Sequence, residues 1–140
     1  MDFPLESIHK NAMKAAEATH CAMDQGKFWE MHDRLFGNQQ TLDQWKAHAE
    51  AVGLDVAKFE DCMSSSKSVP TIRKEMAEAT KGGVTGTPAY VLGATDPKDP
   101  TKVKGLVFIS GARPFDAFKS EIDKALAGLS PAAAAAPPAK

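Results

Sequence analysis

The fold class of this 140-residue chain is decided by Gly82-Gly83-Val84-Thr85-Gly86-Thr87-Pro88-Ala89-Tyr90-Val91-Leu92. The glycines permit a tight turn, because glycine adopts backbone conformations that other residues avoid. Residues 87–92 then combine a proline with aromatic and β-branched side chains, which is typical of a strand that follows a turn. The stretch marks a change from helix to sheet, so the sequence predicts an α/β fold.

The chain before this stretch has the apolar periodicity of helices. Apolar residues recur every three to four positions, which predicts helices over residues 7–25, 27–36, 41–52 and 55–63 and a further helix after Ser68. Thr41 and Gln44 have the spacing of a capping box, and Asp55 is the predicted N-cap of the fourth helix. Phe28 and Trp29 are predicted core residues. Taken alone, such a run would indicate an all-α domain.

A hairpin and one more helix are predicted after the stretch. Residues 105–110 read as a second strand, and the hydrophilic residues 96–100 lie between the two strands. This pattern predicts a hairpin with a long loop, followed by an amphipathic helix from Pro114. A lone hairpin is marginally stable in water, so further strands or a partner are expected to complete the sheet. Residues 130–140 are rich in Ala and Pro and are predicted to form a disordered tail.

Composition excludes several classes of protein. The formal net charge is −1, which gives no general attraction to nucleic acid or anionic lipid. No apolar run approaches the roughly 20 residues that a membrane-spanning helix needs, and the first residues carry no secretion signal. Two cysteines are too few for a disulfide-dense scaffold or a four-thiolate zinc site.

Several short stretches, taken in order, resemble the DsbA-like thiol–disulfide oxidoreductases. They are Phe3-Pro4-Leu5 and residues 15–18, 25–32, 84–88 and 110–118. The resemblance implies a thioredoxin-like α/β fold with an inserted helical domain, from which the N-terminal strand-helix-strand portion is missing. It implies that residues 1–6 end a strand, 7–66 form the insertion, 67–129 complete the thioredoxin-like domain, and 130–140 are the tail.

Pro88 has two interpretations. The residues alone fit an ordinary trans proline at a helix-to-strand turn, because cis bonds occur at only about 5–6% of X-Pro positions. The resemblance instead implies a cis bond, since Thr87 and Pro88 match the family's cis-proline loop. In the family that loop lies against the active-site disulfide and contacts the substrate, so Thr87 and Pro88 are the expected substrate-binding residues.

The family's Cys-x-x-Cys motif does not occur among the 140 residues. At the start of a helix such a motif holds a reactive thiolate, which performs the family's reaction. The two cysteines here are Cys21 and Cys62. The sequence therefore predicts no catalytic residue within the chain and leaves its status as an enzyme undecided. Met1 is expected to mark a truncation or a misplaced start.

Cys21 and Cys62 lie on predicted helices that should pack together. The resemblance implies that they form a non-catalytic structural disulfide, as in some family members, and the alternative is a pair of reduced, buried thiols. Four histidines raise the question of a metal site. None of them has a set of ligands at helical spacing that would favour one, so no metal is predicted.

The resemblance leads to one functional interpretation and two alternatives. The chain is interpreted as the C-terminal part of an oxidoreductase that acts on protein thiols and disulfides. The full-length parent is expected to be periplasmic or otherwise extracytoplasmic, with a membrane-bound or soluble redox partner and no cofactor. One alternative is a non-catalytic binding module, for which a domain-swapped homodimer would complete the sheet. The other is the glutathione-dependent branch of the same fold, which comprises kappa-type transferases and related isomerases.

Overall fold

A computed structural model of the chain describes residues 1–129, which fall into two compact units. The first unit is Met1–Gly83, and the second begins at Val84. Their boundary lies within the glycine-rich turn that separates the helical pattern from the strands. The predicted tail, residues 130–140, lies outside the described residues.

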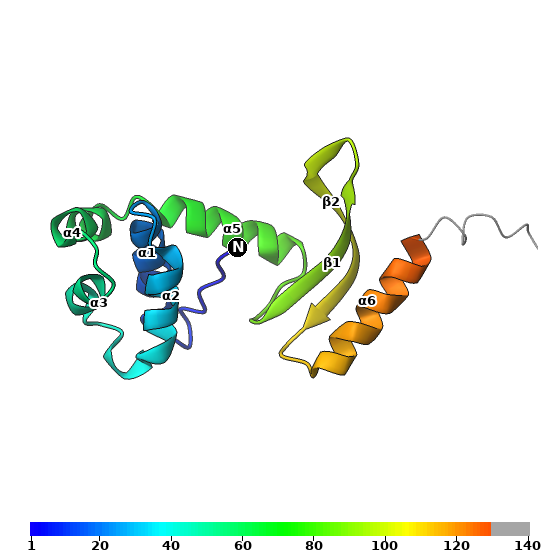
Figure 1. Ribbon diagram of the computed structural model, residues 1–140, viewed down its shortest axis with the longest axis horizontal. Coiled ribbons are helices and arrows are strands. Elements are labelled where there is room, and N and C mark those ends of the chain that lie inside the picture. The colour runs from blue at the N-terminus through cyan, green and yellow to red at the C-terminus, as the bar shows by residue number, and fades with distance from the viewer. Residues whose placement is uncertain (130–140) are drawn as a thin grey trace, which may run out of the picture. The chain divides into compact units, whose positions relative to one another are not determined.

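The first unit is helical. Its elements are α1 (Ala12–Met23), α2 (Phe28–Gly37), the short 3₁₀ helix η1 (Gln39–Thr41), α3 (Trp45–Ala51), α4 (Val56–Ser65) and α5 (Val69–Lys81). Helix α1 contacts α2, α4 and α5, and α3 packs against α2 and α4 (Figure 1). No helix within residues 1–129 is both long and apolar enough to span a membrane.

Helices α1 to α4 enclose one apolar core. Phe59 and Met31 are its largest fully buried side chains. The rest of this core comprises Ala18, Cys21, Ala22, Leu35, Ala49, Leu54 and Cys62. Small residues on α1 allow the neighbouring helices to approach closely, so burial of the larger side chains from α2 and α4 supplies much of the stability of the unit.

Three details of the predicted helices are wrong. Helix α1 begins at Ala12 rather than at Ser7, because the backbone turns where the His9 N–H bonds to the Leu5 carbonyl. Thr41 does not cap α3, since its hydroxyl donates back to the Asn38 carbonyl at 3.2 Å. Trp29 is not a core residue and is 67% exposed on the outer side of α2.

Asp55 caps α4 as predicted. Its Oδ1 accepts a hydrogen bond from the Lys58 backbone N–H at 3.2 Å, which satisfies a backbone donor that the first helical turn leaves free. This hydrogen bond is the main reason why the pKa of Asp55 is lowered, and the contact of its carboxylate with the Lys58 side chain lowers the pKa further.

We predict that Asp55→Asn removes part of the acid sensitivity of the first unit. Because folding lowers the Asp55 pKa, the carboxylate stabilises the fold above its ordinary pKa of 3.8, and this contribution is lost as the pH falls through the lower folded-state value. Asparagine keeps a cap acceptor without the titration. Urea midpoints measured from about pH 6 to pH 2 should fall less steeply for the variant. Parallel profiles would contradict the prediction.

Residues 1–6 are held to the first unit by polar contacts. The Asp2 N–H donates to the Glu75 carboxylate at 2.5 Å, and Asp2 Oδ2 lies 2.7 Å from His20 Nε2. Glu6 pairs with both terminal nitrogens of Arg73 on α5. The predicted end of a strand at residues 3–5 does not form, because the described residues supply no neighbouring strand for its backbone.

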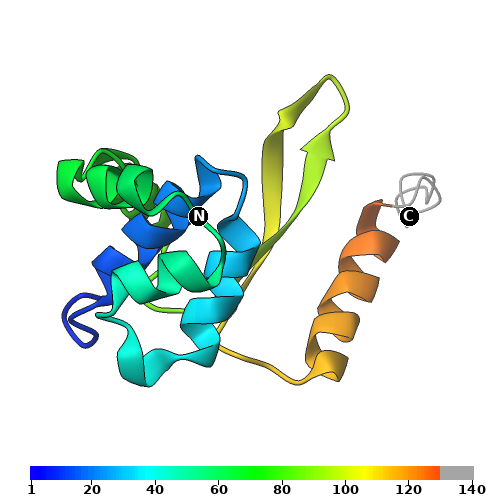
Figure 2. The same ribbon diagram turned by 60° about the vertical axis from the view of Figure 1, so that its left-hand side comes forward.

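The second unit contains an antiparallel hairpin and a helix. Strand β1 (Ala89–Asp96) pairs with β2 (Asp99–Ser110), and α6 (Phe115–Leu129) contacts β2. Figure 2 shows the twisted hairpin and the connection from β2 to α6. Tyr90 meets Phe118 of α6 edge to face, with 4.9 Å between the ring centroids. This contact fixes the face of the hairpin that α6 covers.

The predicted long loop of the hairpin is wrong, because only Pro97 and Lys98 separate the strands. Asp96 Oδ1 accepts a hydrogen bond from the Lys98 N–H at 2.8 Å, and Asp99 Oδ1 accepts one from the Thr101 N–H at 3.1 Å. Such side-chain bonds close a tight turn. Further along, Gly93 has no room for a side chain, since a Cβ there would lie 2.8 Å from the Lys104 carbonyl oxygen.

Candidate functional site

The loop from Val84 to Pro88 leads into β1. The Thr87–Pro88 peptide bond is cis, and both side chains are exposed. The Pro88 carbonyl accepts a hydrogen bond from the Gly111 N–H at 2.8 Å, which joins the start of β1 to the residue after β2. The proline is thereby held at the end of the hairpin where the two strands are paired.

Thr87 has unused hydrogen-bonding capacity. Within residues 1–129, no group bonds to its backbone N–H, its carbonyl or its hydroxyl. Backbone donors and acceptors are normally paired with protein or water. An exposed, unpaired backbone beside a strand can therefore accept the backbone of another extended chain. The pairing of β1 with β2 and the bond from Gly111 to Pro88 hold the end of this loop that leads into the hairpin.

Cys21 and Cys62 are joined by a disulfide between α1 and α4, with 1.99 Å between the sulfurs and 5.8 Å between the Cα atoms. Both residues are buried within the core of the first unit. Next to the bond, the Gln25 side chain accepts from the Asp55 N–H at 2.8 Å and donates to the Asp55 carbonyl at 3.2 Å. The disulfide therefore joins α1 to α4 covalently, and the Gln25 amide joins the turn after α1 to the N-cap of α4.

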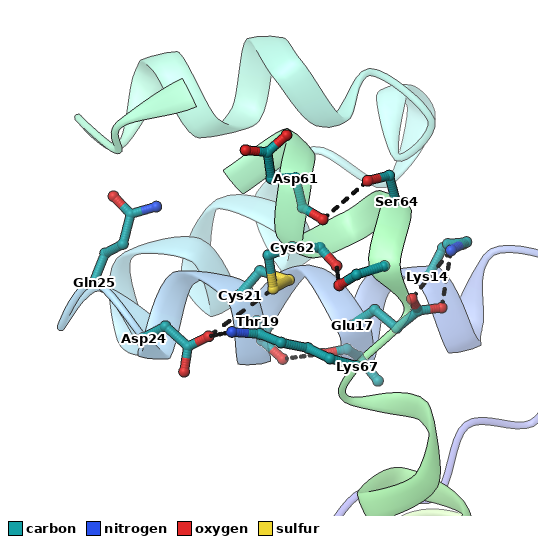
Figure 3. The surroundings of a disulfide bond; sticks show 12 residues. Lys14, Glu17, Thr19, Cys21, Asp24, Gln25, Asp61, Cys62, Ser64 and Lys67 are labelled. Atoms are coloured by element: carbon teal, nitrogen blue, oxygen red, sulfur yellow. Dashed lines mark hydrogen bonds and ion pairs between the residues drawn. A yellow bond between two sulfur atoms is a disulfide. The ribbon is translucent and has the colours of Figure 1, made fainter. Parts of the chain in front are cut away.

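An open pocket of about 410 Å³ lies over the disulfide. Figure 3 shows the Asp24 carboxylate joined by dashed lines to Lys67 and to the disulfide. The Asp24 Oδ2 atom lies 2.6 Å from Lys67 Nζ and 4.0 Å from Cys62 Sγ. The pocket walls are completed by Gln25, Lys58, Asp61 and Ser65. Acidic and basic groups thus line this pocket together with both cysteines.

Three of the four histidines make side-chain contacts within the first unit. His48 is buried, accepts from Arg34 Nε at 3.3 Å through Nδ1, and donates through Nε2 to the Thr41 carbonyl at 2.7 Å. These two bonds assign a neutral ring with its proton on Nε2. His20 pairs with Asp2, and His32 lies 2.9 Å from Asp33. Across residues 1–129, no three His, Cys, Asp or Glu side chains gather as a metal site.

The predicted site residues fall in different units. Thr87 and Pro88 belong to the second unit, and Cys21 and Cys62 belong to the first. Sequence reasoning missed Asp24 and Lys67 beside the disulfide. Lys67 follows α4 and meets Asp24 across 43 positions of the chain, and no local pattern signals such a contact.

Comparison with known proteins gives one family. The sequence profile of the DSBA-like thioredoxin domain matches residues 1–123. No solved structure matches the chain. The match confirms both the resemblance and the expected thioredoxin-like α/β fold class, to which the helices and the antiparallel sheet conform.

The curated relatives are much longer than this chain. The Na(+)/H(+) antiporter NhaA 3 of Salinispora tropica is 31% identical over 105 residues, which is 74% of this chain and 16% of the relative. NhaA 1 of Salinispora arenicola is 36% identical over 62% of this chain and 14% of the relative, and NhaA 1 of Mycolicibacterium vanbaalenii is 33% identical over 75% and 18%. The chain thus spans about one-sixth of the length of these relatives. By its profile match over 123 residues, the chain belongs to the DSBA-like thioredoxin domain family, a family of thiol–disulfide oxidoreductases.

Proposed function

We propose that this chain is the substrate-binding part of an enzyme that exchanges thiols and disulfides in other proteins. The observation that carries the proposal is the exposed Thr87–Pro88 segment, whose Thr87 backbone has no partner among the described residues. Family membership supplies the class of reaction. Thr87 and Pro88 bind the substrate in this proposal, and Cys21 and Cys62 brace the helical unit.

The geometry favours an extended peptide as the substrate. The Thr87 N–H and carbonyl can each pair with the main chain of a peptide, in the way that an added strand pairs with a sheet edge. Main-chain pairing does not depend on the side chains of the peptide. Such sequence-independent binding suits an enzyme that acts on many different unfolded proteins. The binding requires no cofactor.

The reaction itself needs a Cys-x-x-Cys pair that these 140 residues do not contain. In the proposed reaction, a substrate thiolate attacks the disulfide of that pair and forms a mixed disulfide, and the second substrate thiolate then releases the reduced pair. We assign the pair to polypeptide outside this sequence, and its reoxidation to a separate redox partner. We place the reaction outside the cytoplasm, where disulfides persist.

The proposal predicts that the loop binds an extended peptide without covalent chemistry. We expect a short, unstructured peptide that contains S-methylcysteine to shift the amide NMR signals of residues 84–87 and 89 in a saturable manner. The same peptide with its central backbone nitrogen methylated should bind at least about tenfold more weakly, because it can no longer donate to the Thr87 carbonyl. Shifts that avoid residues 84–89, or equal binding of the two peptides, would contradict the proposed role.

A second function is favoured by the names of the relatives. Each of the relatives described above is called a sodium–proton antiporter, and each contains a stretch similar to this chain. The chain would then act as a redox domain alongside a membrane transporter. Co-expression with an antiporter of this type, followed by crosslinking through introduced cysteines, would test the association. Recovery of the chain without the transporter would argue against it.

A further inference from the structure

The disulfide in the first unit has a carboxylate against one of its sulfurs, and this arrangement has consequences for its reactivity. We propose that the Cys21–Cys62 disulfide is an exchange site for small thiols that is entered through Cys62. We further propose that Asp24 makes this site selective for thiols that carry a positive charge. The inference uses no part of the Thr87–Pro88 loop and is independent of the proposed function.

The two cysteines differ in exposure. Cys62 is 8% exposed and Cys21 is 2% exposed, and the open pocket of about 410 Å³ lies over the bond. Thiol–disulfide exchange requires a thiolate to reach one of the sulfurs directly. A thiol of a few heavy atoms fits the pocket, whereas a folded protein does not. Attack by a small thiol is therefore expected at Cys62.

The contact between Asp24 and Cys62 is repulsive toward an attacking thiolate. A disulfide sulfur carries no hydrogen, so the 4.0 Å approach of Asp24 Oδ2 to Cys62 Sγ is not a hydrogen bond. As a thiolate attacks, negative charge gathers on the sulfurs next to the Asp24 carboxylate. Two unit charges 4 Å apart in water repel each other enough to change a rate by about fivefold.

The other charges of the pocket partly offset one another. Lys67 neutralises some of the Asp24 charge at 2.6 Å, and Lys58 is engaged by Asp55 at 3.2 Å. Asp61 has no ion pair among the described residues, and Figure 3 shows its carboxylate directed away from the sulfurs. The two acidic and two basic side chains of the pocket balance in formal charge, so the proposed selectivity rests on Asp24, whose carboxylate lies 4.0 Å from Cys62 Sγ. An ammonium group on the incoming thiol would reduce the repulsion, and a carboxylate would increase it.

The proposed step conserves atoms and electrons. The thiolate of an aminothiol bonds to Cys62 Sγ, the Cys21–Cys62 bond breaks, and Cys21 leaves as a thiolate that takes a proton from water. A second aminothiol thiolate then attacks the mixed disulfide at the sulfur of the first aminothiol and releases Cys62. Two aminothiols are oxidised to their disulfide, and the protein disulfide is reduced to two thiols.

The test measures native-state reduction of the full chain by cysteamine, 2-mercaptoethanol and 3-mercaptopropionate. Each second-order rate is calculated per thiolate and divided by the rate of the same thiol with an unstructured disulfide peptide, which removes intrinsic nucleophilicity. We expect cysteamine to be the fastest and 3-mercaptopropionate the slowest. Asp24→Asn should raise the rate with 3-mercaptopropionate about three- to fivefold and should narrow the spread among the three thiols.

Two further variants separate charge at the sulfur from charge in the pocket. Asp61→Asn removes an acidic group from the same pocket wall and should change the rates much less than Asp24→Asn. Lys67→Gln leaves Asp24 without its partner and should slow all three thiols. Acid-quenched mixed disulfide with cysteamine should map to Cys62 by mass spectrometry.

A measurement on the unaltered chain keeps the proposal testable if a variant does not fold. Raising the salt concentration should bring the three normalised rates together, because screening weakens the charge effect. The proposal is overturned if the normalised rates do not depend on thiol charge, or if the mixed disulfide maps to Cys21. It is also overturned if Asp61→Asn matches Asp24→Asn, or if the rates saturate with thiol concentration, as they would if reduction waited for unfolding.

Discussion

Reduction of the Cys21–Cys62 disulfide should lower the free energy of unfolding of the first unit by about 4 kcal/mol. The bond joins positions that are 41 residues apart, and a closed loop of this length removes roughly that much conformational entropy from the unfolded chain. Much of the core lies between the two cysteines, including Met31, Leu35 and Phe59. A loss of this size is a large share of the stability of a small unit.

The measurement uses the two tryptophans, Trp29 and Trp45, which both lie within the loop that the disulfide closes. Their fluorescence reports unfolding of the first unit alone. Urea denaturation of the reduced and oxidised chains gives the difference directly. The Cys21→Ala/Cys62→Ala double variant is the control, because its denaturation should not respond to reductant. Coincident curves for the reduced and oxidised chain would show that the bond does not brace the unit.

Phe59→Ala should cost about 3–5 kcal/mol in the free energy of unfolding of the first unit. Phe59 is fully buried on α4 within the core that α1 to α4 enclose. Truncation to alanine removes its apolar contacts and leaves a cavity that the surrounding helices fill only in part. Urea denaturation monitored by tryptophan fluorescence measures this loss. The same denaturation of Phe59→Ala with its disulfide reduced shows whether the unit still folds when both contributions are removed.

Phe36→Ala is the matched control for this prediction. Phe36 lies on α2 of the same unit and is 66% exposed, so the same truncation removes little buried surface. Its effect should stay near or below about 1 kcal/mol. If both variants lose the same stability, the packing described for Phe59 is not the source of the effect.

Elements whose signals are local could be predicted from the sequence. Helix α2, the Asp55 cap, the helix that follows Ser68 and both strands were predicted because their apolar spacing and turn residues lie within a few positions of each other. The long hairpin loop was a wrong prediction for a physical reason. Asp96 and Asp99 bond to backbone N–H groups and close the turn, whereas composition alone shows only a hydrophilic stretch.

Contacts between distant parts of the chain could not be predicted in this way. Asp24 and Lys67 meet beside the disulfide, and Arg34 meets His48 in the core, without any periodic signal. A local pattern can also mislead. Thr41 and Gln44 have the spacing of a capping box, but Thr41 ends a 3₁₀ helix and does not cap α3. For the candidate sites, family resemblance supplied Thr87, Pro88 and the cysteine pairing, while the charges around the sulfurs emerged only from the three-dimensional arrangement.

The attachment of residues 1–6 has a consequence for local opening of the first unit. This segment has no strand partner within residues 1–129, and it is held to the unit by the buried Pro4 and by polar contacts of Asp2 and Glu6 with α1 and α5. The loop between Cys21 and Cys62, in contrast, is closed covalently around an apolar core. Amide protons should therefore exchange with solvent first in the N-terminal segment and last in α1 and α4, so that the unit opens in stages rather than as a single cooperative block.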